Sequence, residues 1–249
     1  MKIIDTHTHL PGLSFGLKPR PASKLRQEFE AEGLTGAWLF TTDGLLGEPA
    51  RNNDILTETV AEHRDFFAPF CTVNPLDGAD AAIRELDRCK SKLGMRGLKL
   101  HPWLQAFSMM NPAVEPVLAH AGALGFPVVF HDGTPPYTSS LQIAALAEKV
   151  PQTTIVLGHA GLDDLFEDAI LACQRHSNIF LCLCGVSCGH IEQIIHRCPP
   201  ERLLFGSDGG FASQLIELRI DMLRETDASA SVLRQIFYAN PQRLLPLPV

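Results

Sequence analysis

The chain alternates between short apolar runs and longer amphipathic stretches almost from end to end. Apolar runs of about four to eight residues are typical of buried parallel strands. The longer stretches predict surface helices, such as the one that a polar residue opens at Ser23 and that Gly33 stops. The predicted strands are Lys2–Asp5, Gly36–Thr41, Phe66–Val73, Arg96–His101, Pro127–His131, Thr154–Gly158, Asn178–Leu183 and Leu203–Ser207. The predicted helices are Ser23–Glu32, Asn53–His63, Ala79–Leu93, Pro112–Leu124, Ser140–Lys149, Leu162–Arg175, His190–His196, Ser213–Glu225 and Ser229–Leu245.

This order of elements predicts one α/β domain over residues 1–249, a single TIM-type (β/α)8 barrel whose last helix, Ser229–Leu245, packs on the outside. A doubly wound parallel sheet is the alternative. That fold usually carries a glycine-rich phosphate-binding turn after its first strand, and the loop from Pro11 to Pro21 does not have this pattern. We find no repeat, low-complexity tract or linker that would divide the chain.

Composition narrows the class of protein. The 249 residues are 45% hydrophobic and 20% charged, which suits a globular protein with a large core. A net charge of −7 and scattered basic residues argue against nucleic-acid binding. No apolar run approaches the roughly 20 residues of a membrane helix. The odd number of cysteines, seven, favours reduced thiols in the cytoplasm. We expect a small-molecule substrate, and a homo-oligomer is compatible with the sequence.

Polar side chains of the kinds that do chemistry fall at the ends of the predicted strands. They are His7 and His9 after the first strand, Lys99 and His101 in the fourth, His131 in the fifth, His159 after the sixth and Asp208 after the eighth. In a (β/α)8 barrel these points converge on one face, where the loops after the strands build the active site. The sequence therefore predicts an active site at the carboxyl ends of the strands.

His7 and His9 are two residues apart, so on an extended chain their imidazoles share one face and can reach one ion. Zinc and similar metals take nitrogen and oxygen ligands, and His131 and Asp208 could complete a site of three histidines and one carboxylate. A water molecule on such an ion has its pKa lowered towards about 7. For the His-x-His pair by itself, two partly buried histidines with backbone partners explain the pattern equally well.

Other polar residues have alternative interpretations. Lys99 is either a cation at the barrel mouth paired with Asp208 or a substrate contact, and His101 is a substrate contact or a packed histidine. Trp103, Tyr137 and Phe211 lie in loops of the same face and could form an apolar wall. Histidines in or beside predicted helices are interpreted as structural: His63, His120, His176, His190 and His196. Cysteines around the seventh strand lack C-x-x-C pairs and are interpreted as small apolar residues rather than a second metal site: Cys182, Cys184, Cys188 and Cys198.

Six segments together resemble the signature series of the amidohydrolase superfamily, in the correct order over nearly the whole chain. They are IIDTHTHL at the start, GLKLHP at 97–102, VVFHDG at 128–133, VLGHAG at 156–161, LLFGSDGGF at 203–211 and NPQRLL at 240–245. Within the superfamily they are most similar to the "amidohydrolase 2" branch, which includes aminocarboxymuconate-semialdehyde decarboxylase.

The resemblance implies a distorted (β/α)8 barrel in which His7, His9, His131 and Asp208 bind one divalent metal, usually zinc and alternatively manganese. It also implies that His159 sits beside the metal and polarises water or substrate. Two-metal relatives carry a carbamylated lysine on the fourth strand, near the place of Lys99, whose unmodified amine we expect to bind a substrate anion. One lactonase group of the branch works without a bound metal.

These observations lead to a metal-dependent hydrolase of a small ester, lactone or amide as the first hypothesis. Asp208 would act as general base towards a metal-activated water, and His159 and Lys99 would stabilise charge on the carbonyl oxygen. The substrate contacts would be Lys99, His101, Trp103 and Phe211. The alternative is a metal-dependent decarboxylase with the same ligands. Hydrolysis is favoured because the chain is shorter than typical decarboxylases of the branch. A barrel that only binds a ligand is disfavoured, because the whole ligand set is present.

Overall fold

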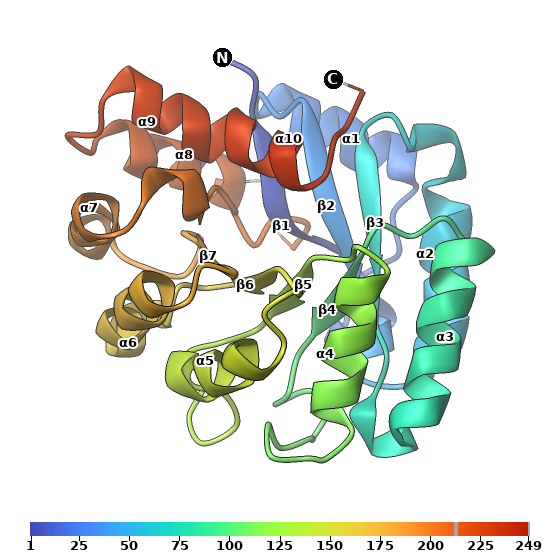
Figure 1. The fold of residues 1–249 in the computed structure, drawn as a ribbon. Helices are drawn as coiled ribbons and strands as arrows, with labels where there is room; N and C mark the ends of the chain where they lie inside the picture. The colour runs from blue at the N-terminus through green and yellow to red at the C-terminus, as the bar shows by residue number, and fades with distance from the viewer. Residues whose placement is uncertain (212–213, 249) are drawn as a thin grey trace.

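The computed structural model describes residues 1–211 and 214–248. Within those residues the strands form one eight-stranded parallel sheet in the order β1 to β8, with helices between successive strands (Figure 1). The strands are β1 (Ile4–Leu10), β2 (Gly36–Thr41), β3 (Phe67–Cys71), β4 (Gly97–Leu100), β5 (Val128–Phe130), β6 (Ile155–Leu157), β7 (Ile179–Cys182) and β8 (Leu203–Leu204). The predicted TIM barrel is confirmed.

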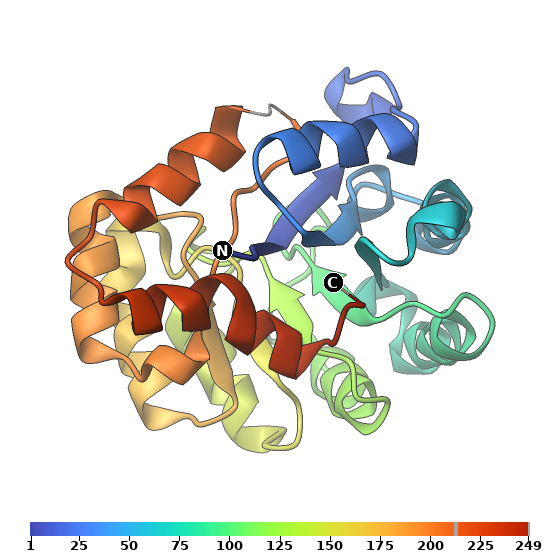
Figure 2. The same ribbon diagram turned by 90° about the horizontal axis from the view of Figure 1, so that it is seen from above.

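The helices lie around the outside of the sheet, as the view from above shows (Figure 2). They are α1 (Ala22–Ala31), α2 (Pro49–Thr59), α3 (Ala79–Ser91), α4 (Val114–Ala123), α5 (Ser140–Lys149), α6 (Leu162–Arg175), α7 (Cys188–Arg197), α8 (Gln214–Arg224), α9 (Ala230–Arg234) and α10 (Asn240–Leu244). No helix in the described part of the chain is long and apolar enough to cross a membrane.

The segment that follows β8 closes the barrel against β1. β8 is only two residues long, and beyond it Thr8 forms a parallel bridge with Gly209. The backbone N–H of Asp208 donates to the carbonyl of His7 at 2.9 Å, and His9 N–H donates to Gly209 O at 2.7 Å. Closure of the barrel therefore brings Asp208 next to the two histidines of β1.

Two layers of apolar side chains fill the molecule. One lies between the strands and the outer helices and includes Leu39, Leu98 and Ile143. The other fills the barrel and includes Trp38 and Phe70, whose rings stack at 4.9 Å. Leu245 and Leu247 belong to this inner layer. In Figures 1 and 2 the chain around α10 crosses the end of the barrel where the N-terminus lies. That end of the barrel is therefore covered, and a site for a substrate has to lie at the opposite end.

The predicted first strand, Lys2–Asp5, is wrong in its boundaries. β1 runs from Ile4 to Leu10, and every residue in it is buried. His7 and His9 therefore lie within the strand rather than after it. The apolar pattern stops at Asp5 because the side chains that follow are polar, although β1 pairs with β2 as far as Leu10.

Other boundaries differ by a turn or less. The predicted helix Asn53–His63 begins earlier, at Pro49, and ends at Thr59, with a separate 3-10 turn at Ala61–His63. The predicted helix Ser213–Glu225 appears as α8, and its first residue, Ser213, lies outside the described residues. The expected single helix Ser229–Leu245 is interrupted by a π-helical turn, Gln235–Ala239, between α9 and α10.

Candidate metal centre and active site

Strand β1 carries the two histidines at the centre of the site. His7 is fully buried and His9 is 6% exposed, and their ring centroids lie 5.3 Å apart. Both imidazoles contact the ring of Phe40 from β2 edge-on, at 5.2 and 5.5 Å. Phe40 therefore forms part of an apolar floor on which the two imidazoles rest.

Asp208 faces both histidines from the segment after β8. Its Oδ1 lies 3.1 Å from Nε2 of His9 and 3.6 Å from Nε2 of His7. Its backbone has a φ of 61°, a left-handed conformation that is uncommon for residues other than glycine and is often found at functional sites. Burial acts to raise the pKa of Asp208, but the hydrogen bond to His9 and the electrostatic interaction with the nearby imidazoles hold it well below the usual value. The carboxylate is therefore ionised at neutral pH.

The tautomer of His7 follows from its neighbours. Its Nδ1 lies 2.9 Å from the carbonyl oxygen of Gly158, which can only accept, so Nδ1 carries the hydrogen. Nε2 is then an unprotonated acceptor, and the amine of Lys99 lies 3.1 Å from it. Burial first, and then the charge of Lys99, lowers the pKa of His7 well below its ordinary value. A neutral imidazole with a free Nε2 is the form that binds metals.

These residues fit a divalent ion. One donor atom each from His7, His9 and Asp208 lies within 4.8 Å of the others, so a single ion could reach all three. Two imidazole nitrogens and one carboxylate oxygen suit zinc or manganese. Nδ1 of His9 is buried and has no hydrogen-bond partner among the described residues.

Three more histidines lie beside this centre. His131 stacks on His101, with ring centroids 3.8 Å apart and planes 10° apart, and its ring lies 4.4 Å from that of His159. Nε2 of His131 is 2.9 Å from Oγ1 of Thr134. His131 is thus at the edge of the site and outside the group formed by His7, His9 and Asp208, and its role as a ligand remains a prediction. Burial lowers the pKa of His159 to about 3 and that of His101 to about 2, so both are neutral.

Asp132 supports His159 and was not among the predicted site residues. Its Oδ1 accepts the backbone N–H of His159 and its Oδ2 accepts that of Gly161, both at 2.7 Å. The turn that follows His159 contains Ala160 and Leu162, whose φ values are positive, at 48° and 56°. The fully buried carboxylate therefore fixes an unusual turn that presents the imidazole. Asp132 directly follows His131 in the sequence, but this position alone does not reveal which backbone groups its carboxylate accepts.

A second buried carboxylate, Asp5, was also missed. Its side chain accepts the backbone N–H groups of His7 at 3.0 Å and Ser207 at 3.1 Å, and it also accepts the Ser207 hydroxyl. Burial raises the pKa of Asp5 to about 7. Asp5 joins the strand that carries the histidines to the segment that carries Asp208.

The predicted substrate contacts differ in depth. Lys99 is 1% exposed and reaches the floor of the site, where its Nζ lies 5.0 Å above the ring of Phe40. The ring of Phe211 lies 5.0 Å from that of His9. Trp103 and Tyr137 are half-exposed at the rim, and Trp103 lies 6.1 Å from His101. A separate surface cavity of about 440 Å³ lies between the loop after β1 and α2.

The helical histidines are found at the surface. His120, His190 and His196 pair with Asp87, Asp163 and Asp227 at 2.7, 2.6 and 3.1 Å. The first two pairs connect neighbouring helices and the third joins α7 to the loop after α8, so all three lie on different elements from the central group. They have no part in the arrangement around Asp208.

Solved structures with the same fold cover nearly the whole chain. The 5-carboxyvanillate decarboxylase from Sphingomonas paucimobilis has a TM-score of 0.77 and 19% identity, with 99% of both chains covered. The 4-oxalomesaconate hydratase from Rhodopseudomonas palustris has a TM-score of 0.73 and 18% identity, with 98% of this chain and 95% of that chain covered. A dihydroxybenzoic acid decarboxylase from Polaromonas, with bound manganese and the inhibitor 2-nitroresorcinol, has a TM-score of 0.71 and 18% identity, with 98% and 96% covered.

No curated protein matches the chain. A family model described as "Amidohydrolase" matches residues 4–247, which include every residue of the site described above. The resemblance inferred from the six motifs is thereby confirmed. The chain belongs to the amidohydrolase family, in its amidohydrolase 2 branch.

Proposed function

We propose that this protein is a metal-dependent decarboxylase that releases carbon dioxide from a small aromatic carboxylic acid. The observation that carries the proposal is the charge at the bottom of the site. The buried amine of Lys99 lies beside Nε2 of His7, next to a donor set that fits a divalent cation. Burial lowers the pKa of Lys99 to about 8, so the amine is still largely protonated at neutral pH. With a cation bound, Asp208 leaves a net positive charge that favours an anionic substrate.

The planar side chains at the site favour a flat substrate. His101 and His131 are stacked on each other, and Phe211 lies over His9. Planar side chains of this kind contact the face of an aromatic ring better than a branched aliphatic group. The substrate would enter between this wall and Lys99.

The similar structures support this reaction more than hydrolysis. Those from Sphingomonas paucimobilis and Polaromonas are decarboxylases, and a third is a hydratase. The expectation of a hydrolase depended on chain length. The comparison with the Sphingomonas enzyme covers 99% of both chains, so the decarboxylase shares the whole barrel with this protein.

The residues that would hold the ion are His7, His9 and Asp208, with His131 as the predicted fourth ligand. Manganese is bound in the Polaromonas structure, and the donor set here suits manganese or zinc. When bound, the ion would supply positive charge that holds the oxygens of an acidic substrate.

The protein's own groups account for the proton that decarboxylation requires. The ionised Oδ1 of Asp208 would take the proton of a ring hydroxyl and return it to the ring carbon that bears the carboxylate. The bond to that carboxylate then breaks, its electron pair restores the aromatic ring as a phenolate, and carbon dioxide leaves. The phenolate regains a proton from solvent. Lys99 would bind the carboxylate, and the neutral His159 would orient the ring through a hydrogen bond.

The test is to incubate the manganese-loaded protein with 2,6-dihydroxybenzoate labelled with carbon-13 in the carboxyl group, and in parallel with a panel of esters, lactones and amides. We expect labelled carbon dioxide from the first and no acid release from the panel. Asp208→Asn should lower turnover by about 10²-fold or more while the fold is kept, since asparagine tolerates a left-handed backbone. Acid release from an ester or lactone without carbon dioxide from any hydroxybenzoate would establish the hydrolase instead.

A further inference from the structure

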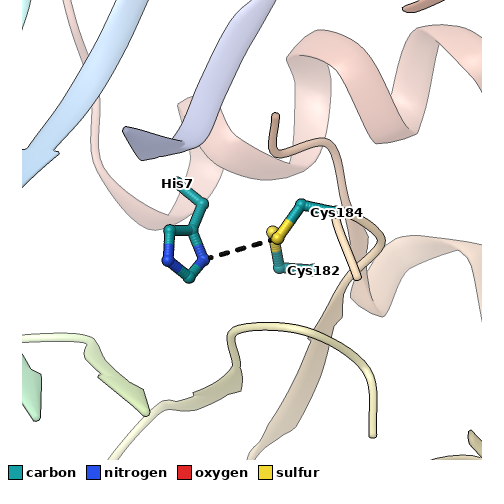
Figure 3. A group of neighbouring side chains, drawn as sticks. All are labelled: His7, Cys182 and Cys184. Atoms are coloured by element: carbon teal, nitrogen blue, oxygen red, sulfur yellow. Dashed lines mark hydrogen bonds between the residues drawn. The ribbon is translucent and has the colours of Figure 1, made fainter. Parts of the chain in front are cut away.

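The ring nitrogen of His7 that faces away from Asp208 lies near two thiols. Cys182 ends β7 and Cys184 follows two residues later, and both side chains point towards His7 (Figure 3). The Sγ atom of Cys184 lies 3.7 Å from Nδ1 of His7. Cys182 and His7 are fully buried and Cys184 is 2% exposed. Nδ1 and the two sulfur atoms all lie within 4.8 Å of one another.

We infer that His7, Cys182 and Cys184 form a second metal site, which selects a thiophilic ion such as Cd²⁺, Cu⁺ or Zn²⁺. For a tetrahedral ion with metal–sulfur bonds near 2.3 Å and metal–nitrogen bonds near 2.0 Å, ligating sulfur and nitrogen atoms are about 3.5 Å apart. The separation of 3.7 Å between Cys184 Sγ and His7 Nδ1 is close to this value. Thiolate ligands select soft ions over manganese, whereas the carboxylate of Asp208 favours harder ones.

The surroundings leave room for the sulfur atoms and offer a further donor. A Cβ atom at position 206 would lie 2.3 Å from Cys182 Sγ, so glycine there makes the space that the thiol occupies. Nδ1 of His159 lies 3.2 Å from Cys184 Sγ and could serve as a fourth ligand. Two sulfur and two nitrogen donors are a common set for a closed tetrahedral site.

The contacts that an ion would replace are few. Cys184 Sγ and His7 Nδ1 both lie 2.9 Å from the carbonyl oxygen of Gly158, and Cys182 Sγ accepts a long contact of 3.6 Å from the Thr6 hydroxyl. The Thr6 hydroxyl also donates to Phe205 O at 2.7 Å, so it keeps a partner if Cys182 binds an ion. The carbonyl of Gly158 therefore loses both of its contacts, and Lys99 loses its acceptor at Nε2 of His7 when the ring hydrogen moves there.

Metal binding at this site and metal binding at the Asp208 centre compete with each other, because both need the imidazole of His7. A neutral imidazole has one N–H group, and in the structure it is at Nδ1. An ion bound to Nδ1 moves that hydrogen to Nε2, which can then no longer ligate an ion beside Asp208. A soft ion at the thiol pair therefore weakens metal binding at the Asp208 centre.

The first test is a titration of the reduced, metal-free protein with Cd²⁺, followed by sulfur-to-cadmium charge-transfer absorption in the ultraviolet. We expect saturation of this band at one equivalent in the wild type. The affinity should fall about ten-fold or more in Cys182→Ser and in Cys184→Ser. Cys188→Ser is the matched control, because Cys188 is exposed on α7, and it should leave the band unchanged. A band that persists in the Cys182→Ser, Cys184→Ser double variant, or disappears with Cys188→Ser, overturns the proposal.

A second measurement needs only the wild type and so does not depend on how the variants fold. X-ray absorption at the cadmium edge should show two sulfur and at least one nitrogen ligand. Cadmium added to the manganese-loaded protein should also release Mn²⁺, detected by its paramagnetic resonance signal in solution. A cadmium shell of nitrogen and oxygen alone would place the ion at the Asp208 centre and overturn the thiol site. Neither readout requires turnover, so both are independent of the proposed decarboxylation.

Discussion

The amine of Lys99 and Nε2 of His7 lie 3.1 Å apart, and the same nitrogen faces Asp208 at 3.6 Å. The lone pair on Nε2 of His7 therefore accepts a hydrogen bond from the buried Lys99 amine, and a metal ion beside Asp208 would need the same lone pair. The ammonium group holds the imidazole in position when the ion is absent, and it repels and competes with the ion when one arrives. Lys99 should thus tune metal affinity as well as bind substrate.

Replacement of Lys99 by Met should strengthen metal binding. We expect the affinity for Mn²⁺, measured by titration calorimetry, to rise about ten-fold or more, because a like charge and a competing donor are removed. Turnover should fall, since the anion contact is lost. Lys149→Met is the control, because that lysine pairs with Glu115 on the surface. Unchanged or weaker Mn²⁺ binding in Lys99→Met would contradict this account.

Asp132→Asn tests the support of the His159 turn. An amide cannot accept both backbone N–H groups, so one buried donor is left unpaired at a cost of about 2–3 kcal/mol in the free energy of unfolding. Urea denaturation measures this loss. The control is Asp163→Asn, an exposed carboxylate that accepts the backbone N–H of Ser187, for which we expect less than about 1 kcal/mol. Equal losses for the two variants would show that the turn does not depend on Asp132.

Gly206→Ala should destabilise the barrel interior. Its Cβ atom would lie 2.3 Å from Cys182 Sγ and 2.8 Å from Cβ of His7, both of which are held in strands. We expect a loss of about 1–3 kcal/mol by thermal or urea denaturation. Gly189→Ala is the matched control, since no atom lies within 4 Å of its Cβ and it is in α7, where alanine gains up to about 1 kcal/mol. A Gly206→Ala protein as stable as Gly189→Ala would refute the close packing.

The stability of the metal-free protein should fall as the pH is lowered. Burial lowers the pKa of five histidines at the site, so the unfolded state binds more protons than the folded state below a pH of about 6.5. Asp5 and Asp132 act in the opposite direction, because burial raises the pKa of Asp5 to about 7 and that of Asp132 to about 6. Because there are five such histidines and only two such aspartates, the histidines determine the net pH dependence.

We therefore expect the Tm, measured by scanning calorimetry with a chelator present, to fall steadily between a pH of about 6.5 and about 4.5. The free energy of unfolding should change by at most about 4 kcal/mol per pH unit, which corresponds to a net uptake of about three protons on unfolding. A Tm that rises as the pH falls through this range would mean that the two aspartates dominate.

Periodicity and strand-end residues were sufficient to predict the barrel and to bring His7, His9 and Asp208 together. Parallel strands with both faces buried read as continuous apolar runs, and such runs are easy to find. The same rule failed at β1, because its polar residues from Asp5 to His9 point at the site and at backbone groups rather than at solvent.

The residues that the sequence did not reveal act through the backbone. Asp5 and Asp132 accept N–H groups from segments that are far away in the chain, and no spacing in the sequence marks such contacts. The thiol pair was taken for packing because a C-x-C spacing has no strong meaning until a histidine from another strand is placed beside it. The π-helical turn at Gln235–Ala239 likewise has no pattern that separates it from a continuous helix.

Because β8 is only two residues long, the metal site forms only when the two ends of the barrel pair. The last pairing of the barrel is made by the backbone of Asp208 itself, and the side chain of Asp5 meets Ser207 across 202 positions of the chain. Contacts so distant in sequence form late in folding. During synthesis, the growing polypeptide therefore carries both β1 histidines long before the carboxylate that completes their ligand group has emerged. The metal ion can therefore bind only after the barrel has closed. A chain truncated before Asp208 should neither close the barrel nor bind the ion.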